Sequence, residues 1–312
     1  MPNKTSIEWT DYSSNPIYAV VKKTGKRGWH CTHASEGCRN CYAEAINKRF
    51  GTGLAYTAQN TEDVRFELSD KECDALRKLN VRCRKLGIRQ KVFIGDMLDL
   101  FHPAIGDDLL NLLFSGTLEI CSSLTFQILT KRSDRMREYL NWRWGEGRIP
   151  SRNIHIGVSV EDEPNANRRI VDLLDTRAAI RFLSIEPLLG PVNLINVFPA
   201  LGCSQDEPAL ADIHWVIVGG ESGQRARGTD LAWIRLIANQ CKDAGVPVFV
   251  KQLGAWPYQN WPDSDYGLRP FQVREGKKQL FPFLNLKSNK GGDPSEWPED
   301  LRIREFPEVA HA

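Results

Sequence analysis

The chain has 312 residues, of which 41% are hydrophobic, and its 41 lysine and arginine residues nearly balance 39 aspartate and glutamate residues. This length fits one large domain or two medium ones, and the charge balance argues against a strongly basic nucleic-acid binder but leaves room for a local basic groove. No segment approaches the roughly 18 to 20 apolar residues of a membrane helix, and the N-terminal MPNKTSIEWTDYSSNP lacks the apolar core of a signal peptide. We therefore expect a cytoplasmic protein with no membrane partner and with reduced thiols.

The first ninety residues predict one strand, a cysteine-rich loop and two helices. We place the strand within residues 6–21 (SIEWTDYSSNPIYAVV) and a helix from CYAEAINKRF onward. A second helical pattern covers residues 61–88, where Ser69 is the expected N-cap and Glu72 lies three residues later, as in a capping box.

From about residue 90, short β-branched or aromatic runs alternate with amphipathic helical stretches. The expected strands are 91–98, 126–132, 154–162, 180–188, 214–223 and 246–254. Strands that alternate with helices imply parallel strands joined by right-handed crossovers. With the N-terminal strand they number about seven, which fits a barrel or an open doubly wound sheet.

The last part of the chain has a different composition. Residues 255–312 are rich in Trp, Pro, Gly and charge, and we expect them to pack on the preceding domain, residues 1–254, through Trp256, Trp261 and Trp297. This extension is either a C-terminal wrap or a lid over a substrate site.

Charged or glycine-rich groups follow nearly every predicted strand. In parallel α/β folds, ligands bind at the carboxyl ends of the strands, so these residues are the candidates for a site. They are Gly95, Asp96, Asp99, Lys131, Arg132, Ser159, Glu161, Asp162, Glu186, Gly219, Gly220, Glu221, Ser222, Lys251 and Gln252. Other polar residues near strand ends read better as helix caps, namely Ser133 with Asp134 and Asp107.

Three of the eight cysteines cluster within HCTHASEGCRNCYAE, on the loop that precedes the second strand. Cys31, Cys38 and Cys41 lie in a polar stretch, which argues against a role as core residues, and Cys41 begins a helix whose dipole favours a thiolate. Three thiolates suit a [4Fe–4S] cluster with one iron left open. A zinc site with His30 or His33 as the fourth ligand is the competing interpretation.

Several sequence blocks resemble the phage Gp37/Gp68 family, over almost the whole chain. They are IEWTD, SNP, GCRNCYAE, FIGDMLDLFHP, FQILTKRSDRM, GVSVED, RFLSIEPLLGPV, WVIVGGESG, FVKQLG and NKGGDPSEWPEDLRIREFP. That family is similar in turn to a divergent branch of radical S-adenosylmethionine (SAM) enzymes. Two features depart from the pattern: the spacing is C-x6-C-x2-C rather than C-x3-C-x2-C, and residues 17–30 look like an inserted hairpin that turns at Lys23, Thr24 and Gly25.

The resemblance implies a partial (β/α)6-7 parallel barrel of the radical SAM (TIM-like) type over residues 1–254, with a cluster loop at 30–42. It implies a cytoplasmic iron–sulfur enzyme that reduces SAM at a [4Fe–4S] cluster and starts radical chemistry on its substrate. The metal ligands would be Cys31, Cys38 and Cys41. The residues for SAM would be Tyr42, Gly95, Asp96, Ser159, Glu161, Glu186, Gly219, Gly220, Glu221 and Ser222.

Substrate and partners are less defined by the sequence. Lys131, Arg132, Lys251 and Gln252 would hold a substrate, and cationic groups suit a phosphate or carboxylate, so a nucleotide or nucleic acid is the candidate class. A reductant protein and a further partner protein are also implied. The alternative is a non-enzymatic iron–sulfur or zinc protein that binds nucleic acid or a partner, for which KKTGKRGWHC offers a small basic face. An ordinary barrel hydrolase or isomerase would leave the three cysteines unexplained.

Overall fold

The computed structural model describes residues 2–195, 209–259, 271–272, 278–279, 284, 286–288 and 290–307. Trp261 and Cys203 lie outside this part of the chain. Two compact units are present: unit 1 comprises Met1–Ser159 and Asp172–Phe182, and unit 2 comprises Val160–Val171 and Leu183–Ala312. The division passes through α6 (Glu163–Leu174) and β9 (Ile180–Ile185), and the predicted boundary after residue 254 lies inside unit 2. Each unit is described by itself.

The expected α/β class is confirmed. A mixed eight-stranded sheet has the strand order β1-β2-β6-β7-β8-β9-β10-β12. Every strand run predicted after residue 90 contains a strand: β6 (Gln90–Ile94), β7 (Leu124–Thr130), β8 (Ile154–Ser159), β9, β10 (Trp215–Gly219) and β12 (Val248–Gln252). The helices between them are α4 (Asp107–Leu113), which continues into a π-helical turn (Phe114–Leu118), α5 (Ser133–Arg143), α6 and α7 (Leu231–Asp243).

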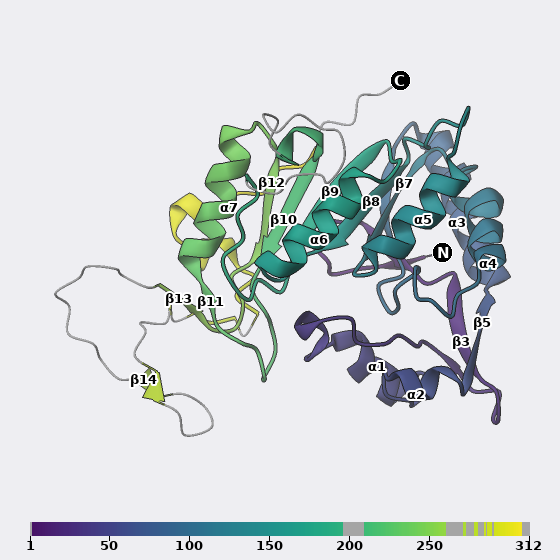
Figure 1. Cartoon of the computed structure of the whole chain (residues 1–312), viewed down its shortest axis with the longest axis horizontal. Coiled ribbons are helices and arrows are strands. Elements are labelled where there is room, and N and C mark those ends of the chain that lie inside the picture. The colour runs from purple at the N-terminus through teal and green to yellow at the C-terminus, as the bar shows by residue number, and fades with distance from the viewer. Residues whose placement is uncertain are drawn as a thin grey trace. The chain divides into compact units, whose positions relative to one another are not determined.

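In unit 1, four strands pair in parallel in the order β2 (Tyr12–Ser14), β6, β7, β8. The short β1 (Asn3–Lys4) is antiparallel to β2, so the sheet is not purely parallel. Val92, Phe126 and Ile154 lie in register and are completely buried, as expected for strands covered on both faces. α3 contacts β7, and Figure 1 shows α5 beside β7.

The opposite face of these strands carries a different set of side chains. Phe93, Gln127 and His155 are in register there, and all three are buried. The Trp9 ring packs 4.9 Å from that of Phe93. Further along β8, a Cβ on Gly157 would lie 2.6 Å from the Phe182 ring, so this position has no room for a side chain.

Three strands within residues 17–68 form a separate antiparallel sheet in the order β4-β3-β5. The hairpin of β3 (Ile17–Val21) and β4 (Arg27–Gly28) is confirmed, with Gly25 at φ +70° in its turn. The other partner of β3 is β5 (Val64–Leu68), which pairs with Ile17–Val21. The helical prediction for 61–88 is therefore wrong over these five residues. Their polar and apolar side chains alternate, as in a strand.

The helix that follows β5 begins later than predicted. It is α3 (Asp70–Leu86), and its Ser69 cap is confirmed, because the hydroxyl accepts a hydrogen bond from Glu72 N at 3.3 Å. The second hydrogen bond of a capping box, from the Ser69 backbone N–H to the Glu72 carboxylate, is not formed. The Glu72 carboxylate accepts a hydrogen bond from Ser14 Oγ at 2.7 Å instead. The remaining helices of unit 1 are α1 (Tyr42–Phe50), as predicted, and α2 (Ala58–Thr61).

Two expected caps are wrong. Ser133 is the first residue of α5, whose N-cap is Arg132, and its hydroxyl donates to Asp172 Oδ2 at 2.6 Å. Asp107 is likewise the first residue of α4 and accepts from Arg135 at 2.7 Å. Both side chains tie one helix to another part of unit 1 instead of closing a helix end.

In unit 2, β10 and β12 pair in parallel from Val216 with Val248 to Gly219 with Gln252. Residues 303–305 of the C-terminal extension lie alongside β12 in the antiparallel direction. Val250 N donates to Ile303 O, and Glu305 N donates to Val248 O. Trp297 is buried and donates from Nε1 to Gly291 O at 3.0 Å. The shorter elements of unit 2 are 3-10 turns at Ala209–Asp212, Pro294–Glu296 and Glu299–Leu301, and the strands β11 (Thr229–Asp230), β13 (Pro257–Tyr258), β14 (Phe271–Gln272) and β15 (Lys278–Gln279).

Among the described residues, the longest and most apolar helices still fall short of what crossing a membrane requires.

Candidate metal centre

The three clustered cysteines lie on the segment between β4 and α1 in unit 1. Cys38 ends a single 3-10 turn (Glu36–Cys38), and Cys41 is the N-cap of α1. All three are free thiols of intermediate burial. Cys31 and Cys41 pack against the same small apolar cluster, formed by Ala43, Tyr56 and Met97. The loop therefore brings two of the three thiols to one apolar wall, and the third lies three residues before Cys41.

Asn47 of α1 fastens both ends of this region. Its buried side chain accepts hydrogen bonds from Trp29 N and Thr52 N, each at 3.0 Å. It donates to Thr52 Oγ1 at 2.7 Å and to Leu54 O at 3.0 Å. One amide thus joins the strand that enters the cysteine loop to the segment that leaves α1.

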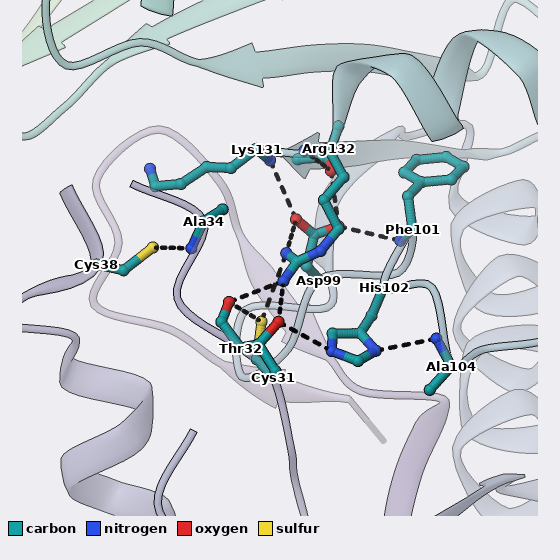
Figure 2. Close-up of polar contacts among 11 residues, drawn as sticks. Cys31, Thr32, Ala34, Cys38, Asp99, Phe101, His102, Ala104, Lys131 and Arg132 are labelled. Carbon is teal, nitrogen blue, oxygen red and sulfur yellow. Dashed lines mark hydrogen bonds and ion pairs between the residues drawn. The ribbon is translucent and has the colours of Figure 1, made fainter. Parts of the chain in front are cut away.

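Arg132, at the end of β7, reaches into the same loop (Figure 2). Its guanidinium donates to Thr32 O at 2.7 Å, to Thr32 Oγ1 at 2.8 Å and to Cys31 Sγ at 3.7 Å. It also forms an ion pair with Asp99 at 2.9 Å. A second donor to a cysteine is Ala34 N, which lies 3.5 Å from Cys38 Sγ.

Burial and nearby charges act in opposite directions on the thiols. Burial raises the pKa of Cys31 to about 11, and the positive charge of Arg132 opposes this. Burial also raises the pKa of Cys41, while backbone N–H groups of the first turn of α1 lower it, so the predicted helix effect is present but smaller than the desolvation. A negative charge on Cys38 would raise the pKa of both Cys31 and Cys41 further.

Each of the two histidines that could complete a zinc site has one partner outside the cysteines, and the buried Nδ1 of His30 has no hydrogen-bond partner among the described residues. His33 Nε2 pairs with Glu44 at 2.9 Å, and His30 Nε2 lies 2.8 Å from Thr61 Oγ1. Burial lowers the pKa of His30 to about 4, so this ring is neutral at pH 7. Within the part of the chain that the structure describes, no three histidine, cysteine or acidic side chains converge closely enough to hold a metal ion.

The predicted SAM residues after β6 meet the start of α1. Tyr42 donates from its hydroxyl to Asp96 O at 2.7 Å, and the Asp96 carboxylate accepts from Asn15 Nδ2 at 2.6 Å. Burial raises the pKa of Asp96. Gly95 has φ +81°, a conformation that other residues rarely adopt, and this turn directs the chain from β6 to Asp96. Tyr42, which directly follows Cys41, is therefore joined to the turn of Gly95 and Asp96.

Two other strand-end residues of unit 1 are Lys131 and Ser159. Lys131 donates its backbone N–H to Asp99 Oδ2 at 3.1 Å, and Ser159 is buried at the end of β8.

In unit 2, the predicted site residues form ion pairs and close backbone contacts. Lys251 Nζ lies 2.8 Å from both carboxylate oxygens of Glu186. Gln252 donates to Gly220 O at 2.8 Å, and its buried Oε1 lacks a hydrogen-bond partner among the described residues.

The Gly-Gly-Glu segment after β10 is packed tightly. A Cβ on Gly220 would lie 2.3 Å from Leu253 O, and one on Gly219 would lie 3.2 Å from Gln252 O. A side chain on Gly220 would therefore collide with the backbone that follows β12, and a side chain on Gly219 would require its neighbours to shift slightly. Glu221 accepts from the backbone and guanidinium N–H groups of Arg227, and Ser222 is exposed.

Glu161 is completely buried and pairs with the equally buried Arg169 at 2.5 Å. A carboxylate in this position has a structural partner, although the resemblance implied a role for it in binding SAM.

Sequence reasoning missed several residues around the cysteines. Thr32, Asn47 and His102 have no motif of their own, and only their contacts in the folded chain reveal them. Thr32 Oγ1 lies 3.2 Å from His102 Nε2, and the two residues are seventy positions apart in the sequence. Asp99 was identified as a strand-end carboxylate, but its partner Arg132 was assigned to substrate.

The comparisons with known proteins give a family and nothing closer. No curated protein and no solved structure matches this chain. The sequence model of a family described as "Protein of unknown function (DUF5131)" matches residues 4–290, and the chain belongs to that family.

Proposed function

We propose that this protein is a radical SAM-type enzyme in which Cys31, Cys38 and Cys41 hold a [4Fe–4S] cluster. The observation that carries the proposal is the set of three free, half-buried thiols on one loop, beside the largely buried guanidinium of Arg132. Three thiolates leave one iron of such a cluster without a protein ligand, and SAM would bind there. The partial barrel of the radical SAM type and the relationship to the phage Gp37/Gp68 family belong to the same proposal.

The residues present fit this group by the kind of donor they offer, and binding would bring the three sulfurs closer together than the described residues place them. Thiolates are the ordinary ligands of iron–sulfur clusters, and N–H donors to the sulfurs are among their usual surroundings. Arg132 and Ala34 are such donors here. The pairing of His33 with Glu44 favours a site made of three thiolates, and His30, whose buried Nδ1 has no hydrogen-bond partner among the described residues, is the histidine left to the zinc alternative.

When bound, the cluster supplies the electron that cleaves SAM reductively, and a separate reductant protein delivers that electron. The chain's own residues bind and orient SAM. Asp96 would accept the SAM ammonium, and Tyr42 fixes the backbone of Asp96 through its hydroxyl. Ser159, Glu161, Glu186 and the segment 219–222 remain predictions for the ribose, methionine and adenosine surfaces.

A nucleotide or nucleic acid is the proposed substrate class. Lys22, Lys23, Lys26 and Arg27 are exposed on the β3–β4 hairpin, which enters the cysteine loop. The same hairpin favours the second candidate function, a non-enzymatic iron–sulfur or zinc protein that binds nucleic acid. Of the other predicted substrate residues, Lys251 already pairs with Glu186.

Anaerobic reconstitution with iron and sulfide tests the proposal. The reduced protein is incubated with SAM, and 5′-deoxyadenosine is measured, together with the broad cluster absorbance near roughly 400 nm. We expect both signals in the wild type and in Cys73→Ala, a control that removes a buried thiol of α3, and neither signal in Cys38→Ala. Tightly bound zinc without SAM cleavage would reject the enzyme in favour of the second candidate.

A further inference from the structure

Arg132 joins three segments of unit 1 that are far apart in the sequence. Its guanidinium contacts Asp99, which follows β6, and both Thr32 and Cys31 of the cysteine loop. Figure 2 shows the side chain in the middle of these contacts, between the end of β7 and the loop. The contact to Cys31 Sγ is 3.7 Å, within the range for an N–H donor to sulfur.

The position of the guanidinium is fixed from the side of the sheet. The side chains of Arg132 and Asp99 are only 11% and 10% exposed. Asp99 in turn accepts from Thr130 Oγ1 at 2.7 Å, Phe101 N at 3.0 Å and Lys131 N at 3.1 Å. A carboxylate with this many donors cannot turn away, so it holds the arginine in one orientation. The loop is therefore fastened to a rigid partner.

We propose that Arg132 is a positioning residue for the iron–sulfur cluster. It holds the Cys31 arm of the loop at the end of β7 and gives one N–H to the Cys31 sulfur. This inference rests on the proposed function, and it gives Arg132 a role other than the substrate binding expected from the sequence.

A cation and an N–H donor beside a ligating sulfur stabilise the more negative, reduced form of a cluster. Loss of Arg132 should therefore lower the reduction potential. It should also loosen the loop, because Thr32 loses both of its contacts to the guanidinium.

The test compares Arg132→Gln and Arg132→Lys with wild type after reconstitution. Arg137→Gln is the matched control, since Arg137 lies on the same helix and pairs with Asp172 instead. Iron and sulfide content, the reduction midpoint from an EPR redox titration and the rate of iron loss to a chelator are measured. We expect Arg132→Gln to lower the equilibrium constant for reduction about tenfold, which is about 59 mV for one electron.

Iron loss should become severalfold faster in Arg132→Gln and remain unchanged in Arg137→Gln. The lysine variant keeps the charge but cannot donate to Thr32, Asp99 and the sulfur together, so it should lose iron faster than wild type with a smaller shift in potential. If the glutamine variant does not fold, the lysine variant decides by its rate of iron loss.

Variants with full iron content and with the wild-type potential and loss rate would overturn this inference alone. A wild-type protein that takes up no iron would overturn the proposed function, and this inference with it. The two failures are therefore distinguishable in one series of measurements.

Discussion

The ion pair between Glu161 and Arg169 allows a quantitative test of what Glu161 does. Both side chains are completely inaccessible to solvent. Replacing Arg169 by Met leaves a carboxylate buried without its cation, and such a change costs about 3 to 5 kcal/mol. Replacing both residues by apolar ones, in Glu161→Leu with Arg169→Met, removes the unpaired charge, so the double variant should be within about 1 kcal/mol of wild type.

Urea unfolding measures these free energies. Far-UV circular dichroism and tryptophan fluorescence should give coincident transitions, which is the condition for using a single free energy of unfolding. The two single variants and the double variant then complete a double-mutant cycle, whose coupling term should amount to at least about 3 kcal/mol.

Two results would refute this reasoning. A cost below about 1 kcal/mol for Arg169→Met would mean that Glu161 does not depend on its partner. If the wild type binds SAM as proposed, a well-folded double variant that does not bind it would mean that this ion pair contributes to the SAM site, as the resemblance implied for Glu161. Unchanged SAM binding in that variant would assign Glu161 to stability alone.

Three further predictions concern the sheet and the surroundings of the cysteines. Gly157→Ala should destabilise the protein by about 1 to 3 kcal/mol in urea unfolding, because the new methyl group meets the Phe182 ring. Adding Phe182→Leu to this variant should recover part of the lost stability. Equal stability of Gly157→Ala and wild type would contradict the prediction. Asn47→Leu removes an amide with four hydrogen bonds and should lower the free energy of unfolding by about 3 kcal/mol in the same assay. A decrease below about 0.5 kcal/mol would contradict this prediction. Burial lowers the pKa of His102 to about 4, so the unfolded chain binds the additional proton and stability should fall as the pH falls from about 6.5 to 4, by up to about 3 kcal/mol. Urea midpoints at pH 7 and 4.5 should differ less in His102→Gln than in wild type, and equal differences would reject the assignment.

The elements from β6 to β12 could be predicted from the sequence because their physical signals are local. Buried parallel strands are short apolar runs, and the helices between them have a regular apolar spacing. The segment 64–68 could not be assigned in this way. Its strand depends on pairing with Ile17–Val21, more than forty residues earlier, and its own five residues adjoin a strong helical pattern.

For the candidate site, too, local features could be predicted from the sequence and long-range contacts could not. Cysteine spacing is visible in the sequence, and so is a polar residue that follows a strand. The partners of those residues are not visible, because they depend on contacts between distant segments. Arg132 with Thr32 is one such pair, and Lys251 with Glu186 is another. Gly220 shows a different limit, since the sequence suggested an approach to a ligand and the contact observed is with the backbone of Leu253.

The β3–β4 hairpin has a practical consequence for work with this protein. A Cβ on Gly25 would have no heavy atom within 4 Å, and residues 22–27 are exposed. The strands of the hairpin are fixed by β5 and the loop after β4 by Asn47, so the turn itself has no part in holding the thiols. A fluorophore or an affinity peptide inserted at Thr24 would therefore report on the loop that carries the three cysteines without altering its anchors.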